Sequence, residues 1–168
     1  MSVLSPCVPS LPRCARQDSP AAEPWLACED ILLDVAAPDG AAALQVLARL
    51  LSRRLVCPQE AVLRRLVQRE ALASTALGHG LALPHAQLAG LAAPVGACVG
   101  LRSPVGFGEP DGQPVRWLIA LLLPVREPQA QLIRLAGLAS RCGEGVFRLA
   151  LARSRTPAEV WKLLTLPA

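Results

Sequence analysis

The chain is poor in aromatic side chains: its 168 residues include two Phe, three Trp and no Tyr. Nucleic-acid-binding proteins commonly stack bases on exposed aromatic rings, so this scarcity argues against nucleic acid as a partner despite a formal charge of +4. The sixteen Arg and one Lys are scattered, with Arg53-Arg54 and Arg64-Arg65 as the densest pairs. Each pair is either a solvated helix face or a docking surface for an acidic partner.

The sequence also lacks a long apolar run and a metal-binding cysteine pattern. Its nearly unbroken apolar stretch, Trp117 to Val125, is far too short to span a bilayer. Arg13 and Arg16 interrupt the N-terminal region, so no secretory signal is visible. The six cysteines contain no C-x-x-C pair and are predicted to be reduced thiols. We therefore predict a cytoplasmic protein without membrane insertion, metal or cofactor.

The chain divides into a short tail and one domain. Residues 1–25 hold five prolines with Ser and Ala and show no periodicity, which predicts a flexible tail. Residues 26–168 are rich in apolar side chains, as one domain with a buried core requires.

The pattern of residues 26–168 mixes strands and helices. Apolar runs predict strands at 31–33, 81–83, 95–101 and 115–123. Helical spacing predicts helices that begin near Gly40, Pro58, Pro128, Gly145 and Pro157, the last behind a capping box at Thr156-Pro157-Ala158-Glu159. Helices that flank a few strands indicate an α/β domain, a mixed β-sheet with helices on both faces.

Candidates for chemistry are few, because the chain has two histidines and no obvious nucleophilic serine elbow. His85 follows Pro84 and is predicted to lie at a strand exit, where rigid backbone holds a side chain that still meets solvent. A neutral imidazole is a good nucleophile toward phosphorus once one ring nitrogen is hydrogen bonded. His79, between two glycines, is expected to be an exposed turn residue, and a metal site that used both histidines would need further ligands.

Donors for a phosphoryl group precede His85. Arg69, Ser74 and Thr75 could hold the charge of a transferring phosphoryl group, since a guanidinium fork and hydroxyls bind its oxygens. The alternatives are a helix end at which Arg69 pairs with Glu70, and a cap or turn at Ser74-Thr75.

The stretch REALASTALGHGLALPHAQL, from Arg69 to Leu88, resembles the active-site signature of mannitol/fructose-type enzyme IIA domains of the bacterial phosphotransferase system. Their pattern is roughly RE-x-x-x-STG-x-G-x-G-x-A-x-PH. Later segments, FGEPDGQPVRWLIALLLPV and QLIRLAGLA, are similar in kind and order, and the stand-alone form resembles the nitrogen-regulatory branch. The resemblance covers about residues 26–166.

The resemblance implies a role for each matching residue. His85 stands where the family's phosphorylated histidine stands, Arg69 at its phosphate-stabilising arginine, and Ser74 and Thr75 at its hydroxyl pair. The implied phosphoryl donor is a small histidine phosphocarrier protein, and the regulated partner proteins are not identified by the sequence.

Two positions depart from the family's pattern. Ala76 replaces the first glycine of the motif, which matters only if that residue needs a positive φ. Gln131 stands where the family often has a second histidine; its amide could bind a phosphoryl oxygen but carries no charge.

The sequence thus supports a regulatory phosphocarrier, with phosphotransferase turnover left open by Gln131. Two alternatives remain: an interaction module of the same fold that does not cycle phosphate, and a stand-alone sugar-transport IIA component.

Overall fold

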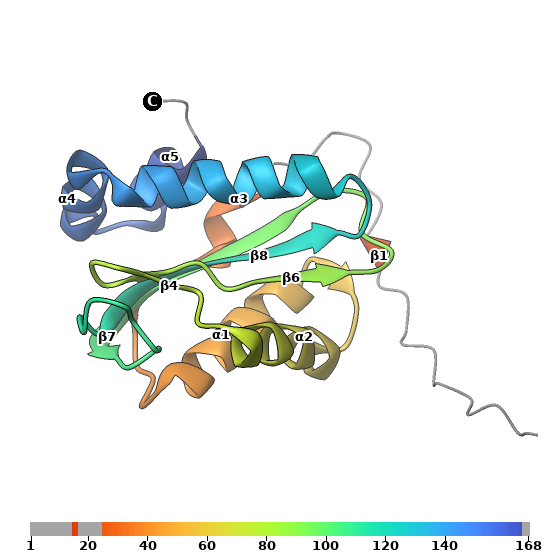
Figure 1. The fold of residues 1–168 in the computed structure, drawn as a ribbon, viewed down its shortest axis with the longest axis horizontal. Coiled ribbons are helices and arrows are strands. Elements are labelled where there is room, and N and C mark those ends of the chain that lie inside the picture. Colours follow the sequence, from red (N-terminus) through yellow and green to blue (C-terminus); the bar gives the residue numbers. More distant parts are fainter. Residues whose placement is uncertain (1–14, 17–24, 166–168) are drawn as a thin grey trace, which may run out of the picture.

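The computed structural model describes residues 15–16 and 25–165, which form a three-layered α/β domain (Figure 1). A six-stranded sheet lies between two layers of helices. The sheet runs in the order β2-β7-β8-β5-β4, and β6 pairs with β8 beyond the end of β5. The predicted mixed sheet with helices on both faces is confirmed.

The strands at the centre of the sheet are long and mostly buried. These two strands, β7 (Val95–Val105) and β8 (Val115–Pro124), are antiparallel, while β2 (Ile31–Val35) pairs with β7 in parallel. Beyond β8 the sheet is built from short pieces, β4 (Ala76–Gly78), β5 (Leu81–Ala82) and β6 (His85–Leu88). Both β5 and β6 run parallel to β8. The active-site motif therefore supplies the edge of the sheet.

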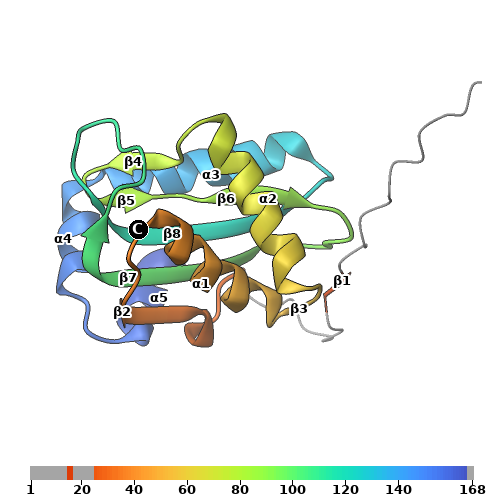
Figure 2. The same ribbon diagram turned by 90° about the horizontal axis from the view of Figure 1, so that it is seen from below.

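Two helices cover one face of the sheet, as Figure 2 shows. The first, α1 (Gly40–Ser52), begins where predicted, because the Asp39 carboxylate accepts a hydrogen bond from Ala42 N at 2.8 Å. Pro58 is the N-cap of α2 (Gln59–Leu72). Leu47, Leu51 and Leu55 lie at helical spacing in the sequence, but Leu55 belongs to the short strand β3 (Leu55–Val56).

The other face carries three helices and has its own core. These helices are α3 (Pro128–Gly143), α4 (Gly145–Arg153) and α5 (Pro157–Thr165). The predicted capping box forms, since Glu159 N donates to Thr156 Oγ1 and Thr156 N donates to Glu159 Oε2. Leu121 of β8 packs with Leu138 and Phe147 in this core, whereas Leu122 packs toward α1 and α2. Alternate residues of one strand thus face opposite layers.

The predicted flexible tail lies largely outside the described residues. Within it, Ala15–Arg16 forms β1 and pairs with β3 in antiparallel register, so this dipeptide is bound to the domain. Trp25 packs against β7: its carbonyl accepts a hydrogen bond from Gly96 N at 2.6 Å, and its ring lies where a Gly96 Cβ would project. A 3₁₀ turn, η1 (Cys28–Asp30), then leads into β2.

The prediction that every cysteine is a reduced thiol is wrong for Cys57, which is disulfide-bonded. Cys28, Cys98 and Cys142 are free, as expected, and the latter two fill the core. Sequence spacing missed the disulfide because spacing alone does not show which cysteines the fold brings together.

Across the described part of the chain, no helix combines the length and the apolar character that crossing a bilayer requires.

Candidate functional site

His85 is the first residue of an edge strand, and not, as the sequence suggested, a residue beyond a strand's exit. The run at 81–83 breaks into β5 and a Pro84 step, and β6 then restarts the pairing, with His85 opposite Leu121 of β8. Proline interrupts the ladder because it has no N–H. Within the described strands, β8 is the sole neighbour of β6. The outer side of His85 is therefore open to a groove.

The imidazole ring of His85 is held at both nitrogens. Its Nδ1 lies 2.8 Å from the Leu83 carbonyl oxygen, which can only accept, so this nitrogen carries the proton. Its Nε2 then has the lone pair and accepts a hydrogen bond from Arg69 Nε at 3.2 Å. The nitrogen that remains nucleophilic is Nε2, and it faces a guanidinium group.

The environment keeps this imidazole neutral. Burial is the largest influence and lowers the pKa of His85; the Leu83 carbonyl opposes it, and the positive charge of Arg69 lowers it further. A neutral imidazole retains the lone pair that nucleophilic attack needs.

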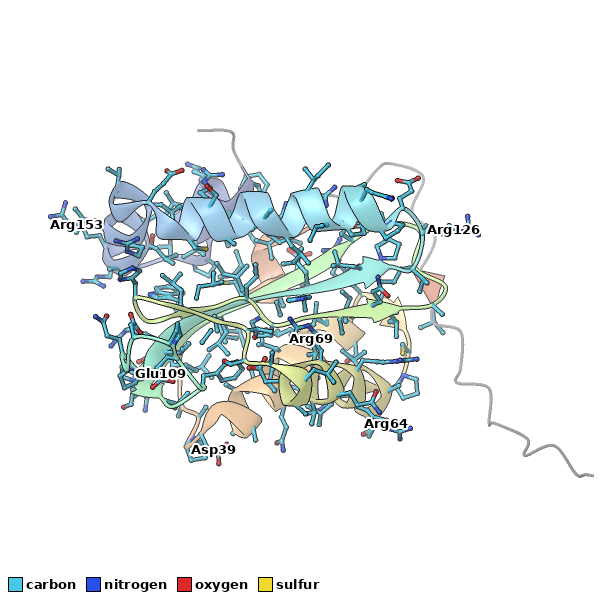
Figure 3. All side chains as sticks on the ribbon, viewed as in Figure 1. Asp39, Arg64, Arg69, Glu109, Arg126 and Arg153 are labelled. Atoms are coloured by element: carbon cyan, nitrogen blue, oxygen red, sulfur yellow. The ribbon has the colours of Figure 1, made fainter. Side chains whose placement is uncertain are left out.

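Arg69 reaches His85 from the opposite layer of the molecule. His85 shares a sheet face with Leu121, which packs under α3 and α4, whereas Arg69 belongs to the last turn of α2 on the other face. Its Nε lies 3.2 Å from His85 Nε2, and Figure 3 labels Arg69 near β6. Its terminal nitrogen Nη1 donates to the Ala73 carbonyl at 2.9 Å, which fixes the guanidinium plane.

The predicted hydroxyl pair is used inside the protein. Thr75 is buried; its N–H donates to Glu70 Oε1 at 2.8 Å and its hydroxyl to Glu70 Oε2 at 2.5 Å. Ser74 Oγ donates to the Phe107 carbonyl at 2.6 Å and accepts from Ala76 N at 3.1 Å. Neither residue lines the groove at His85. The turn that follows Arg69 is thus fastened to α2 and to the loop that holds Phe107.

Glu70 is the residue whose role the sequence missed. As a neighbour of Arg69 it suggested a salt bridge, but its carboxylate binds Thr75, while Arg69 binds His85. A carboxylate five residues before a buried Thr is a usable signal for such a turn, but it becomes specific only once α2 is known to end at Leu72.

His79 is part of a tight turn and lies away from the groove. It has a left-handed backbone with φ 54°, between Gly78 and Gly80, and its N–H donates to Asp111 Oδ2 at 2.7 Å. The side chain of Asp111 lies where a Gly78 Cβ would project. Ala76, by contrast, has no positive φ, so its replacement of a glycine costs the backbone nothing.

A groove with a volume of about 470 Å³ joins the two helical layers at His85. Its walls come from α2, β6, β8 and α3, and are formed by Arg65, Gln68, Arg69, Leu72, His85, Ala86, Gln87, Leu123, Pro128, Gln131, Leu132 and Leu135. Gln131, on α3, and His85, on β6, both line this groove. The contacts of the described residues include no hydrogen bond between them.

Gln131 has an unusual environment. It is 8% exposed, and its amide oxygen is buried with no hydrogen-bond partner among the described residues. A buried acceptor without a donor costs about 1–3 kcal/mol. Such a group at the wall of an open groove marks a place where a ligand can supply the missing donor.

The described residues contain no group of three or more His, Cys, Asp or Glu side chains that could hold a metal ion. The groove brings together a nucleophilic nitrogen, a guanidinium and an amide. This set of groups is suited to binding an anionic group with several acceptor oxygens.

Residues 25–166 match the model of the family described as phosphoenolpyruvate-dependent sugar phosphotransferase system, EIIA 2. Curated relatives named nitrogen regulatory protein include one from Escherichia coli (strain K12), 31% identical over 73% of this chain and 76% of the relative. Another, from Bradyrhizobium diazoefficiens, is 33% identical over 74% and 82%.

Solved structures agree with these relatives. Nitrogen regulatory protein IIA-Ntr from Neisseria meningitidis has a TM-score of 0.80 and 34% identity, over 83% of this chain and 96% of that one. IIA mannitol from Escherichia coli has a TM-score of 0.64 over 82% and 97%, and at 22% identity it shows the shared fold alone.

These findings confirm the resemblance that the motif indicated, including its nitrogen-regulatory branch. The family description supports a general phosphotransferase role. The chain belongs to the EIIA 2 family of the phosphoenolpyruvate-dependent sugar phosphotransferase system.

Proposed function

We propose that this protein is a cytoplasmic regulatory phosphocarrier that accepts a phosphoryl group on His85 from a histidine phosphocarrier protein. The observation that carries the proposal is the state of the imidazole. Leu83 binds Nδ1–H, so the lone pair of Nε2 is directed to the groove beside Arg69. Fixing one nitrogen in this way leaves the other as the nucleophile.

The transfer can be written with these groups alone. The Nε2 lone pair forms a bond to the donor's phosphorus as the bond between that phosphorus and the donor's imidazole nitrogen breaks, and the bonding pair leaves with the donor. Nδ1 keeps its proton, and the Leu83 carbonyl stabilises the positive charge that develops on the ring. Arg69 exchanges its hydrogen bond to Nε2 for bonds to the phosphoryl oxygens, which a guanidinium can bind through two N–H groups.

Gln131 is proposed to contribute a neutral hydrogen bond where relatives often use a second histidine. Its amide N–H₂ can donate to a phosphoryl oxygen directly or through one water. Ser74 and Thr75 were predicted to bind the phosphoryl group, but their contacts favour a supporting role in which they hold the turn after Arg69 in place. A phosphoryl group would change the charge of the groove, and so select the protein that binds there.

The proposal is tested by incubating the protein with the general phosphotransferase proteins and labelled phosphoenolpyruvate. The label should be acid-labile and should map to His85. The variant His85→Ala should carry none, while His79→Ala, which alters the other histidine of the chain, should be labelled normally. Label that persists in His85→Ala would assign the phosphoryl group to another residue and refute the proposal.

A non-cycling interaction module is the second candidate, and the neutral Gln131 favours it. The two candidates differ in a single measurement. A phosphocarrier returns the phosphoryl group to the dephosphorylated donor protein, whereas a module without turnover never acquires it.

A further inference from the structure

The groove at His85 is flanked by exposed apolar side chains from both helical layers. Leu72, at the end of α2, is 83% exposed, and Leu132, on α3, is 67% exposed. Both line the groove. Large apolar side chains left open on two sides of a groove are typical of a surface that another protein covers.

The charge of the groove has one sign. Its lining includes Arg65 and Arg69 but no Asp or Glu. Arg65 has no ion pair among the described residues, and Arg69 donates to uncharged acceptors. Glu70, the acid closest in sequence, is turned to Thr75. A positively charged surface without neighbouring acidic side chains favours a partner with negative charges.

Gln131 supplies an independent observation. Its buried amide oxygen has no donor among the described residues and lies at the wall of the groove. A partner that draws this amide outward and donates an N–H or O–H group to its oxygen removes a desolvation penalty that the free protein carries.

We infer that the groove docks a protein that inserts an apolar side chain between α2 and α3, flanks it with carboxylates for Arg65 and Arg69, and donates a hydrogen bond to Gln131. The inference rests on the proposed function in one respect, because it names the class of the regulated partner. It is tested without phosphorylation, so the two can fail separately.

The test uses three blocked tripeptides as probes, acetyl-Glu-Leu-Glu-amide, acetyl-Gln-Leu-Gln-amide and acetyl-Lys-Leu-Lys-amide. Each is titrated into the ¹⁵N-labelled full chain, and amide shifts are followed by NMR. At about 20 mM salt the Glu peptide should bind roughly tenfold more tightly than the Lys peptide, with the Gln peptide between them. The difference should shrink at about 500 mM salt, where charges are screened. The shifted amides should be those of the groove.

Two neighbouring arginines provide the matched control. Arg65 lines the groove, whereas Arg64, next to it on α2, is exposed and does not. Figure 3 places Arg64 on the outer side of that helix. Arg65→Gln should weaken binding of the Glu peptide by roughly threefold or more, while Arg64→Gln, with the same loss of net charge, should leave it unchanged.

Several results would overturn the inference. They are equal or tighter binding of the Lys peptide, no groove shifts with the Glu peptide at about 10 mM, and equal weakening by Arg64→Gln and Arg65→Gln. Equal weakening by the two variants would mean that the peptide responds to the net charge of the protein and not to the groove. If the Glu peptide binds as expected but His85 accepts no phosphoryl group, the docking surface stands and the phosphocarrier proposal alone fails.

Discussion

Two polar regions lie on either side of Arg69, and they differ in how their hydrogen bonds are satisfied. In the turn after α2, Ser74 and Thr75 use their hydroxyl groups on Phe107 and Glu70. In the groove, Gln131 has a buried oxygen without a partner among the described residues, and the Nε2 of His85 accepts its one hydrogen bond among them from Arg69. The satisfied region positions the site, and the unsatisfied region is left for a ligand.

Arg69 links the two regions, so its replacement should have the largest effect on transfer after loss of His85 itself. Arg69→Lys keeps the charge but loses the planar fork and the Nε–H that meets His85. Phosphoryl transfer should slow by ten- to a hundredfold, or about 1.4–3 kcal/mol in the barrier. Quench-flow rates and thermal melting, measured side by side, check this. A variant that melts early yet transfers normally when folded would make Arg69 a structural residue.

Breaking the satisfied region should reduce stability before it reduces chemistry. Thr75→Val removes one hydroxyl from the Glu70 carboxylate at nearly constant volume. We expect a loss of about 1–3 kcal/mol in the free energy of unfolding, because a partly buried carboxylate loses a hydrogen-bond donor. Urea titration measures it, with Ser140→Ala on α3 as a control. Loss of transfer with unchanged stability would return Thr75 to the phosphoryl-binding role that the motif implied.

The unsatisfied region should respond in the opposite direction. Gln131→Met replaces the amide with an apolar group of similar size and should stabilise the protein by about 1 kcal/mol. The same change should lower the transfer rate or shorten the lifetime of the phosphorylated form.

Gln131→His sharpens the comparison further, because a histidine that can protonate adds a charge-assisted bond to the phosphoryl oxygens. It should raise the rate or the lifetime. If neither Gln131→Met nor Gln131→His alters phosphorylation, Gln131 has no part in transfer.

The smallest expected effect is a pH dependence from His85. Its folded pKa lies below the ordinary value of 6.5, so the unfolded chain binds the proton first as pH falls. Stability from this residue is complete above about pH 6.5 and is lost as pH falls toward the folded pKa. Urea unfolding at three pH values between about 7.5 and 5.5 should show a decline that His85→Ala lacks. An identical decline in that variant would exclude His85 as its cause.

Local signals predicted much of the fold. Asp39, Pro58 and Thr156-Pro157 mark helix starts that the structure confirms, because caps and first-turn prolines act on neighbouring backbone groups. The alternating apolar run predicted β7 and the continuous one predicted β8, because such patterns also involve residues close together in the chain. Gln131 was singled out by the family resemblance and not by spacing, and its part in the site stays a prediction.

By itself, then, the sequence determined the α/β class, the helix starts and the identity of the motif, all of which depend on residues close together in the chain. The tertiary structure decided the rest. Only the folded sheet shows that His85 is the first residue of β6 and that Arg69 contacts it from the other helical layer. The same holds for Thr75, whose hydroxyl is hydrogen bonded to Glu70. These outcomes depend on which layer each segment joins, and a layer is chosen by burial over the whole domain, which no local pattern records.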